Sequence, residues 1–517
     1  MTEVFNWVDQ LFAFVVPISN FLWDFPTNYA WYSNIPILGQ FSLAILLLLG
    51  IGVYFTARTV FVQVKYFKRG IQLLTSKQKS KVGESQLTAF LLSTASRVGA
   101  GNIVGVTGAI SIGGPGAIFW MWVSAFLGMS TSFAEATLAQ LFKERKGDQY
   151  VGGFTFYIQK LWGNLAWVGS GMCILYLIYN MLSIPVHTFH VFTAANSVID
   201  EVTGKSSNQT EPIYYVVALL IIFSIAFISF GGVHKVTKVT DKIVPIMAIG
   251  YTVVVLALVV INIAAVPAFF ASVFKGAFQP EAIFGGAFGV ALAQGLKRGL
   301  LSNEAGMGTA TQAASIAHSN HPCEQGFVQS IGVFLDTIII CSLAGFVVGA
   351  GHLWSTSEAA WETLQNDKLG LFLASARELV PGTAADSIVV LFLAIAFGLF
   401  AFTTLLGDVV YAEIAANKIS RKKSFISGIR ILGALFFVPL GTLTVLAGLQ
   451  LDNLWSVSDF INVVLVFINV PTLIVGSKIV MKAFKNYCSA PGKLFNSEEI
   501  GIASDVWTGR SDENDQV

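Results

Sequence analysis

Charge is what this chain has least of. Only 12% of its 517 residues are Asp, Glu, Lys or Arg, about half the share usual in soluble domains. Apolar residues make up 54% of the chain, and the mean hydropathy is +0.69. This composition indicates an integral membrane protein. The net charge of +1 indicates nothing about partners, and no basic cluster suggests nucleic acid, so we expect no nucleic-acid partner.

Cysteine is also rare, and its positions exclude several chemistries. The four cysteines, Cys173, Cys323, Cys341 and Cys488, have neither metal-ligand nor redox spacing. The chain contains no His-Glu-x-x-His run, no Gly-x-Ser-x-Gly elbow and no P-loop. We therefore do not expect an enzyme.

Lys and Arg are missing from the first 30 residues. The basic region of a cleavable signal peptide is thus lacking, and we expect no such peptide. The segment from Phe5 to Phe25 is apolar but contains Asp9, Pro17 and Asp24. This pattern predicts a helix that lies in the membrane interface.

Long apolar runs, by contrast, are abundant. A helix needs about 20 mostly apolar residues to cross a bilayer. We count eleven candidate spans, near residues 37–63, 86–110, 116–142, 165–192, 212–232, 243–263, 281–316, 328–350, 386–416, 425–449 and 456–484.

The loops between these spans alternate in positive charge. Lys and Arg gather near residues 65–81, 143–146, 235–242 and 418–423 and after 478, whereas the opposite loops hold only Lys205, Lys275, Lys368 and Arg377. Positively charged loops stay in the cytoplasm. The N-terminus is therefore predicted outside and the C-terminus in the cytoplasm.

Two spans are interrupted by glycine and polar residues. The first contains the run from Ser96 to Asn102, and the second contains Lys297, Arg298 and the run from Ser302 to Gly308. Irregular backbone at membrane depth is tolerated only inside protein or along a wet cavity. Two such segments at matching places point to the binding site of a secondary transporter.

Span counting adds a symmetry to this pattern. Without the first span, ten remain, and the second five run upside down relative to the first five. We predict an all-α polytopic membrane protein with eleven transmembrane helices, a LeuT-type 5+5 inverted repeat and one extra N-terminal span. The predicted segments are 1–36 (extracellular, interfacial), 37–85 (extra span and cytoplasmic loop), 86–263 (first repeat), 278–485 (second repeat) and 486–517 (a cytoplasmic, polar tail). From Ser489 to Val517 we expect this tail to be disordered.

The breaks themselves predict ligand chemistry. Gly99 and Gly101 let the backbone unwind, and a helix that restarts presents free N–H groups suited to a carboxylate. Carbonyls at the second break suit the ammonium group. An alternative is that the glycines only permit close helix packing. The predicted substrate residues of the two breaks are Val98, Gly99, Ala100, Gly101, Asn102, Ser302 and Asn303.

Sodium has a predicted place as well. In LeuT-type proteins, an ion lies between the first broken helix and hydroxyl groups on the third helix of the second repeat. Thr403 and Thr404 stand there in this chain, so we predict Na⁺ ligands at Ala95, Val98, Thr403 and Thr404. The alternative is that both hydroxyls bond to their own helix.

Charged and polar residues inside spans are costly and usually functional. We predict an ion pair between Arg97 and Asp408, and structural ion pairs for Glu135 and Glu413. On the fourth span, Asn180 and His187 are further candidate substrate residues, with packing as the alternative role.

Several runs resemble the alanine/glycine:cation symporter family, the sodium:alanine symporters of bacteria and archaea. They include Gly113-Gly114-Pro115-Gly116-Ala117 and Ser302-Asn303-Glu304-Ala305-Gly306-Met307-Gly308, within a match over roughly residues 40–485. The resemblance implies Na⁺-coupled uptake of a small neutral amino acid, usually alanine or glycine, across the cell membrane. Some members are proton-coupled, and some take glutamine.

Two departures from the family pattern leave the substrate open. Where the family has Thr-Val-Gly-Thr-Gly-Asn, Arg97 and Ala100 replace the two threonines. Where it often has Gln-Ala-Asn on the fourth span, this chain has Pro185-Val186-His187-Thr188. The expected partners are an amino acid and membrane lipid, with Na⁺ as coupling ion. The alternatives are a proton-coupled or glutamine-type symporter, or a channel.

Overall fold

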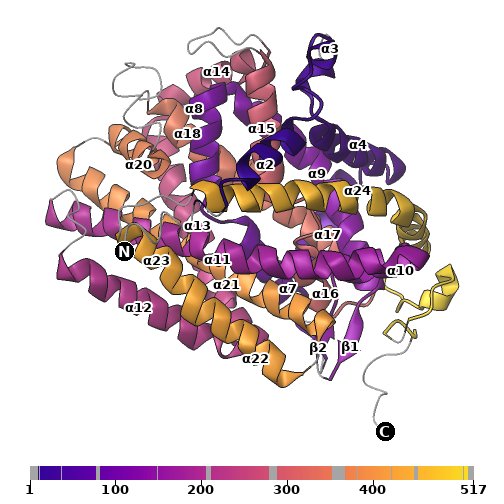
Figure 1. The fold of residues 1–517 in the computed structure, drawn as a ribbon. Coiled ribbons are helices and arrows are strands. Elements are labelled where there is room, and N and C mark those ends of the chain that lie inside the picture. The colour runs from indigo at the N-terminus through magenta and orange to yellow at the C-terminus, as the bar shows by residue number, and fades with distance from the viewer. Residues whose placement is uncertain are drawn as a thin grey trace.

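Helices build nearly all of this protein, as the apolar runs predict (Figure 1). The computed structural model describes residues 10, 12–35, 38–76, 82–147, 149–204, 211–278, 288–351, 367–380, 382–420, 422–446, 452–504 and 506–509. Within these ranges the sheet is one hairpin, in which β1 (Glu144–Lys146) pairs antiparallel with β2 (Gln149–Val151). Eight helices of the described chain are long and apolar enough to cross a membrane, judged by length and composition.

The long helices coincide with predicted spans and differ from them mainly at the ends. The uninterrupted ones are α9 (Gly116–Leu141), α11 (Ala166–Thr203), α12 (Pro212–Ser229), α13 (Gly232–Ile261), α21 (Thr383–Ile419) and α24 (Asp452–Ser489). Two more contain a π-helical segment: α17–η5–α18 (Pro322–Val333, Phe334–Cys341, Ser342–Ala350) and α22–η7–α23 (Lys423–Leu432, Gly433–Phe437, Val438–Leu446). The first predicted span is the shorter α4 (Leu43–Arg58).

The two predicted interruptions are real breaks. Helix α7 (Gln86–Arg97) starts where the Ser85 side chain accepts the N–H of Thr88, and it stops at Arg97. The chain restarts as the π-helical turn η2 (Gly101–Gly105) and α8 (Val106–Gly113). In the second half, α15 (Phe288–Asn303) ends before α16 (Thr311–Ile316). Residues 281–287 of the predicted seventh span lie outside the described residues.

Small residues bring helices close together around these breaks. A Cβ on Gly299 of α15 would overlap the hydroxyl of Ser124 on α9, and one on Gly295 would overlap the Ala117 carbonyl. Such contacts are the usual way that membrane helices pack, because lipid provides no hydrophobic drive between them. Helices α11 and α21 also pack along one another (Figure 1). The breaks are therefore enclosed by protein.

Shorter elements surround this bundle. They are α3 (Ala30–Ser33), η1 (Leu38–Gln40), α5 (Val62–Lys65), α6 (Phe67–Leu74), α10 (Phe154–Leu161), η3 (Gly163–Leu165), η4 (Ile263–Ala265), α14 (Val266–Phe278), α20 (Lys368–Glu378) and η8 (Ser497–Ile500). The N-terminal α2 (Val15–Asp24), predicted as an interfacial helix, packs on α24 (Figure 1). There the buried Trp23 donates its indole N–H to the Asp459 carbonyl at 2.8 Å.

The predicted disorder of the tail is wrong for its described part. The Phe495 N–H donates to the Asn320 carbonyl at 3.0 Å, and the Trp507 indole donates to the Gln140 carbonyl at 2.7 Å. Both rings are at most 5% exposed. Two large aromatic side chains provide enough burial to hold an otherwise polar segment against the helices.

Candidate functional site

The two breaks lie next to each other, joined by two side-chain hydrogen bonds. Asn102 donates its amide to the Ser302 hydroxyl at 3.1 Å, and Ser96 donates its hydroxyl to Glu304 Oε1 at 2.8 Å. In each bond, one partner belongs to the first break and the other to the second. Segments about 200 residues apart in the chain thus form one irregular region.

The first break leaves two backbone N–H groups without an acceptor. The Gly99 N–H, which follows the end of α7, donates to the Arg97 carbonyl at 2.9 Å and to Asn102 Oδ1 at 2.8 Å. No acceptor within the described residues lies in hydrogen-bond reach of the Ala100 or Gly101 N–H. These groups stand at the N-terminus of the restarted helix Gly101–Gly113, where the helix dipole is positive.

The second break leaves carbonyl groups without a donor. The Ala305 N–H turns to Asn303 Oδ1 at 3.0 Å, and the Gly306 N–H turns to Glu135 Oε1 at 3.0 Å. In a continuing helix, these two donors would serve the carbonyls of Leu301 and Ser302. Among the described residues, neither carbonyl accepts another hydrogen bond.

Glu135 holds the second break open, which differs from the ion pair that we predicted for it. Its Oε1 accepts from the N–H groups of Gly306 and Gly308, at 3.0 and 2.9 Å, and from Asn469 Nδ2 at 2.6 Å. Both glycines have positive φ, 95° and 82°, which glycine adopts without steric cost. The carboxylate thus replaces the helix carbonyls as acceptor. The expected ion pair of Glu413 is present, with Arg430 at 2.6 Å.

Asn102 has a structural role that we did not foresee. Its Nδ2 donates to Asp336 Oδ1 at 2.6 Å, while Asp336 Oδ2 accepts from the hydroxyls of Ser302 and Thr337 at 2.8 and 2.7 Å. Asp336 lies in the π-helical segment η5, a local geometry that is frequent at functional sites. Asn102 and Asp336 are fully buried. Asn102 and Asp336 therefore connect the two breaks within the protein interior.

A cavity of about 720 Å³ opens beside the two breaks, within the range of roughly 300–1,000 Å³ typical of small-molecule sites. It extends to Asp200 near the end of α11 and to Lys368 at the start of α20. Predicted site residues along its wall are Arg97, Gly99, Ala100, Gly101, His187, Ser302, Thr404 and Asp408. Those that do not line it are Ala95, Val98, Asn102, Asn180, Asn303 and Thr403.

Two of the residues off the cavity wall, Asn180 and Asn303, have their side chains engaged elsewhere. Asn180 donates to the Tyr176 carbonyl of its own helix at 2.6 Å. The Asn303 Oδ1 accepts the N–H of Ala305 at 3.0 Å. These amides are fully buried, so they shape the helices instead of facing the cavity.

The two predicted sodium-binding hydroxyls point in different directions. Thr404 Oγ1 lies 3.0 Å from the Ala95 carbonyl, across from α21 to α7, and also 3.0 Å from the Phe400 carbonyl of its own helix. Thr403 Oγ1 bonds to the Leu399 and Phe400 carbonyls of its own helix, both at 3.1 Å. Adjacent helix residues are about 100° apart around the axis, so only one of the two can face the break. Both hydroxyls thus bond to their own helix, as in the alternative given above, and of the two only Thr404 also reaches a carbonyl of α7.

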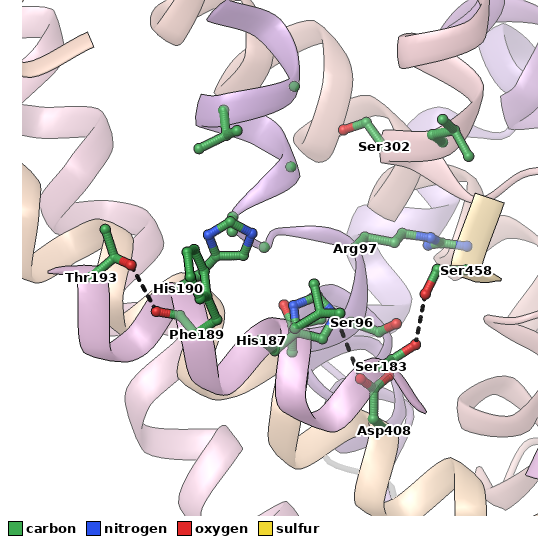
Figure 2. Close-up of a pocket in the computed structure, with 18 of the residues that line it drawn as sticks. Ser96, Arg97, Ser183, His187, Phe189, His190, Thr193, Ser302, Asp408 and Ser458 are labelled. Carbon is green, nitrogen blue, oxygen red and sulfur yellow. Dashed lines mark hydrogen bonds and ion pairs between the residues drawn. The ribbon is translucent and has the colours of Figure 1, made fainter. Parts of the chain in front are cut away.

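The predicted ion pair between Arg97 and Asp408 is not formed. The Arg97 guanidinium donates to Ser132 Oγ at 3.1 Å and to Gln329 Oε1 at 3.1 Å. Asp408 Oδ2 instead lies 3.5 Å from His187 Nε2. In Figure 2 the guanidinium does not point toward Asp408, whereas His187 and Asp408 are joined by a dashed line. Sequence position on two facing helices did not reveal which way each side chain turns.

Sequence reasoning missed part of the cavity wall. Ser458, Asn462 and Asp459 of α24 line it, and Ser183 of α11 lies 3.5 Å from Ser458 (Figure 2). Ser458 and Asn462 are four residues apart and so share one face of their helix. Polar residues at this spacing in an apolar span were an available signal.

Comparison with known proteins places this geometry in a family. The model of the sodium:alanine symporter family matches residues 29–498. The amino-acid carrier protein AlsT of Bacillus subtilis (strain 168) is 36% identical over 468 residues, which are 90% of this chain and 92% of AlsT. The sodium/proton-dependent alanine carrier protein of Bacillus sp. (strain PS3) is 31% identical over 449 residues, 84% of this chain and 95% of that protein.

Similarity to solved structures concerns the fold alone. The crystal structure of MhsT in complex with L-phenylalanine matches with a TM-score of 0.51 and 14% sequence identity, over 83% of this chain and 95% of that one. The shared feature is the arrangement of the helices.

Proposed function

Because this chain belongs to the sodium:alanine symporter family, we propose that it carries a small neutral amino acid into the cell together with Na⁺, by alternating access. Alanine and glycine are the first candidate substrates. The driving force is the inward Na⁺ gradient with the membrane potential, which contributes about 2.3 kcal/mol per charge per 100 mV.

One observation carries the proposal: the two breaks present complementary unpaired backbone groups at the same cavity. The N–H groups of Ala100 and Gly101 match a substrate carboxylate, and the carbonyls of Leu301 and Ser302 match its ammonium group. All four residues line the cavity, and the Asn102–Ser302 bond fixes the distance between the two breaks. A zwitterion would satisfy both ends at once.

Sodium binds, in this proposal, between α7 and α21. The Ala95 carbonyl and Thr404 Oγ1 are 3.0 Å apart, and the Val98 carbonyl has no donor among the described residues. Three oxygen atoms at the edge of the substrate site suit a hard cation. Binding of the ion beside the substrate couples the two, because each stabilises the same unwound backbone.

The membrane arrangement proposed is the eleven-span, 5+5 inverted repeat with the N-terminus outside. In that orientation, the end of α11 that carries Asp200 faces the exterior, so the cavity is open to the outside. On the other side of the breaks, Glu135, Asn469 and the 306–308 backbone form a closed hydrogen-bonded layer. Opening to the cytoplasm would require this layer to separate from the breaks.

A second candidate is coupling to protons. The relative from strain PS3 is named for dependence on sodium and protons, and His187 faces Asp408 at 3.5 Å on the cavity wall. Glutamine is a further candidate substrate, since the cavity exceeds what a methyl side chain needs. Both are separated from the first proposal by the same assay.

The test is uptake into proteoliposomes of labelled alanine, glycine and glutamine, under an inward Na⁺ gradient, a pH gradient or neither. Accumulation that requires Na⁺ supports the proposal. Uptake driven by the pH gradient alone supports proton coupling, and uptake that never exceeds equilibration contradicts symport.

A pair of glycine variants tests the carboxylate position. A Cβ on Gly101 meets nothing within 4 Å and would project where the carboxylate is expected, so Gly101→Ala should weaken apparent affinity by about tenfold or more. The matched control is Gly105→Ala, whose Cβ meets only Arg298 Cδ at 3.9 Å and whose affinity should stay within about twofold. Equal affinities for the two variants would contradict the proposed carboxylate site.

A further inference from the structure

Arg97 is a cation on the cavity wall for which no carboxylate of the described residues lies in hydrogen-bond reach. Its side chain is buried, with 3% of the residue exposed, at the last position of α7. The guanidinium donates to Ser132 Oγ at 3.1 Å and to the Gln329 Oε1 and carbonyl oxygens at 3.1 and 3.3 Å. All three partners are neutral oxygen atoms. An arginine inside a membrane protein usually pairs with an acid.

The surroundings of this guanidinium are built to receive it. A Cβ on Gly332 of α17 would overlap Nη1, so the glycine leaves the space that the group occupies. Gln329 Oε1 is itself oriented by the Ser93 hydroxyl at 2.7 Å, and Gln329 Nε2 donates to Gln325 at 3.2 Å. Hydrogen bonds to other residues therefore hold the Gln329 side chain in place independently of the guanidinium. Neutral oxygens in fixed positions are also what a bound alkali cation would need.

Three buried carboxylates interact electrostatically with this one charge. They are Glu135, Glu304 and Asp336, each of which has Arg97 among its charged neighbours. Each carboxylate is hydrogen-bonded by neutral donors at the breaks: Glu135 by backbone N–H groups, Glu304 by Ser96 and Thr309, and Asp336 by Asn102 and Ser302. A shared cation lowers the cost of keeping these acids in a low-dielectric interior.

We propose that the Arg97 guanidinium is a built-in cation of the transport site, which takes the place of one mobile coupling ion. The acids at the breaks then always have a positive neighbour, and only the site at Thr404 exchanges sodium with water. Each transport cycle moves one Na⁺ with one neutral amino acid. This inference rests on the proposed symport function and adds its stoichiometry.

The competing explanation is that Arg97 only braces α7 against α9 and α17. Both explanations predict that removing the side chain harms the protein. The two explanations differ in the sodium dependence that they predict, because a purely structural Arg97 would not affect how many Na⁺ ions bind. The decisive quantity is therefore the number of charges moved per substrate, together with the sodium cooperativity of uptake.

The experiment measures charge and substrate flux together in proteoliposomes that contain the purified full chain. The wild-type protein should move about one charge per amino acid and show a sodium Hill coefficient of about one. Arg97→Lys keeps the charge and should retain both values. Arg97→Thr and Arg97→Gln should need about tenfold more sodium, with a Hill coefficient that rises toward two, as a second Na⁺ fills the vacated position.

Controls separate the possible failures. Arg430→Gln removes another half-buried arginine, away from the cavity, and should leave charge per substrate and cooperativity unchanged. Two charges per substrate in the wild type, or unchanged sodium dependence in folded Arg97→Gln, would overturn the inference. Folded but inactive Arg97→Lys would favour the brace. If the neutral variants do not fold, the wild-type charge ratio and Arg97→Lys still decide. Absence of sodium-driven uptake in the wild type would instead refute the proposed function.

Discussion

Substitution of two adjacent threonines gives the sharpest test of the sodium site. Thr404→Val removes a hydroxyl that lies 3.0 Å from the Ala95 carbonyl, on the side of α21 that faces the first break. Among the described residues, the hydroxyl that Thr403→Val removes bonds within its own helix and to the Met247 sulfur at 3.4 Å, with no partner on α7. Both side chains are at most 5% exposed, and valine matches threonine in shape. The pair therefore differs in ligand chemistry but hardly in packing.

The expected magnitude follows from what each hydroxyl contacts. A hydrogen bond or ligand to a charged group contributes about 1.5–3 kcal/mol, which corresponds to a roughly 10- to 150-fold loss of sodium affinity in Thr404→Val. Thr403→Val loses a bond that the helix carbonyls do not need, since their own N–H donors remain, so its affinity should change by less than about threefold. Thr404→Ser should restore most of the affinity because it retains the hydroxyl.

The assay is amino acid uptake as a function of external Na⁺ concentration, with thermal unfolding of each purified variant as a check on folding. The half-saturating Na⁺ concentration should rise in Thr404→Val alone. If both valine variants bind sodium equally well, or if Thr403→Val is the weaker binder, then the orientation of these hydroxyls does not define the ion site and the reasoning fails.

Three further outcomes are expected. Glu135→Met leaves the N–H groups of Gly306 and Gly308 without an acceptor. This loss should reduce the free energy of unfolding by about 2–5 kcal/mol and lower the thermal midpoint of the purified protein. An unchanged midpoint would mean that the second break does not depend on this acid. Trp507→Ala should release the C-terminal segment more than Trp507→Phe does, seen as faster tryptic cleavage after residue 493. Both variants lose the bond to the Gln140 carbonyl, but only alanine also loses the buried aromatic ring. Burial lowers the pKa of His321 to about 4, whereas an unfolded histidine titrates near about 6.5. The contribution of His321 to folding stability is therefore complete above about pH 6.5 and declines toward pH 4 by up to about 3 kcal/mol. His321→Asn, which can still accept the Cys323 N–H, should flatten that part of the pH–stability curve.

The positions of the two breaks were readable from the sequence because they depend on local chemistry. Glycines and polar residues within apolar runs cannot continue an ordinary membrane helix, and the unpaired N–H groups at Ala100 and Gly101 follow from helix termination itself. The same holds for the predominance of helices, since a chain so poor in charge must satisfy its backbone internally. The family runs around residues 113–117 and 302–308 are local signals as well.

Side-chain partners were not readable in this way. The sequence placed Arg97 and Asp408 on facing helices, yet the first turns to Gln329 and Ser132 and the second to His187. Thr403 and Thr404 are identical in type and adjacent in sequence, and the rotation of α21 against α7 decides that only Thr404 reaches the Ala95 carbonyl. Glu135 was expected to pair with a cation, but the open backbone at Gly306 and Gly308 is what its carboxylate meets.

Composition and local chain chemistry thus determined that this is a helical membrane protein with two broken spans, because apolar length and helix termination act over a few residues. The tertiary structure alone decided how the breaks meet, which hydroxyl faces them and where the buried charges turn. Those outcomes depend on the rotation and separation of helices that are far apart in the chain. The Asn102–Ser302 hydrogen bond, for example, joins residues 200 positions apart, and no local sequence pattern specifies it.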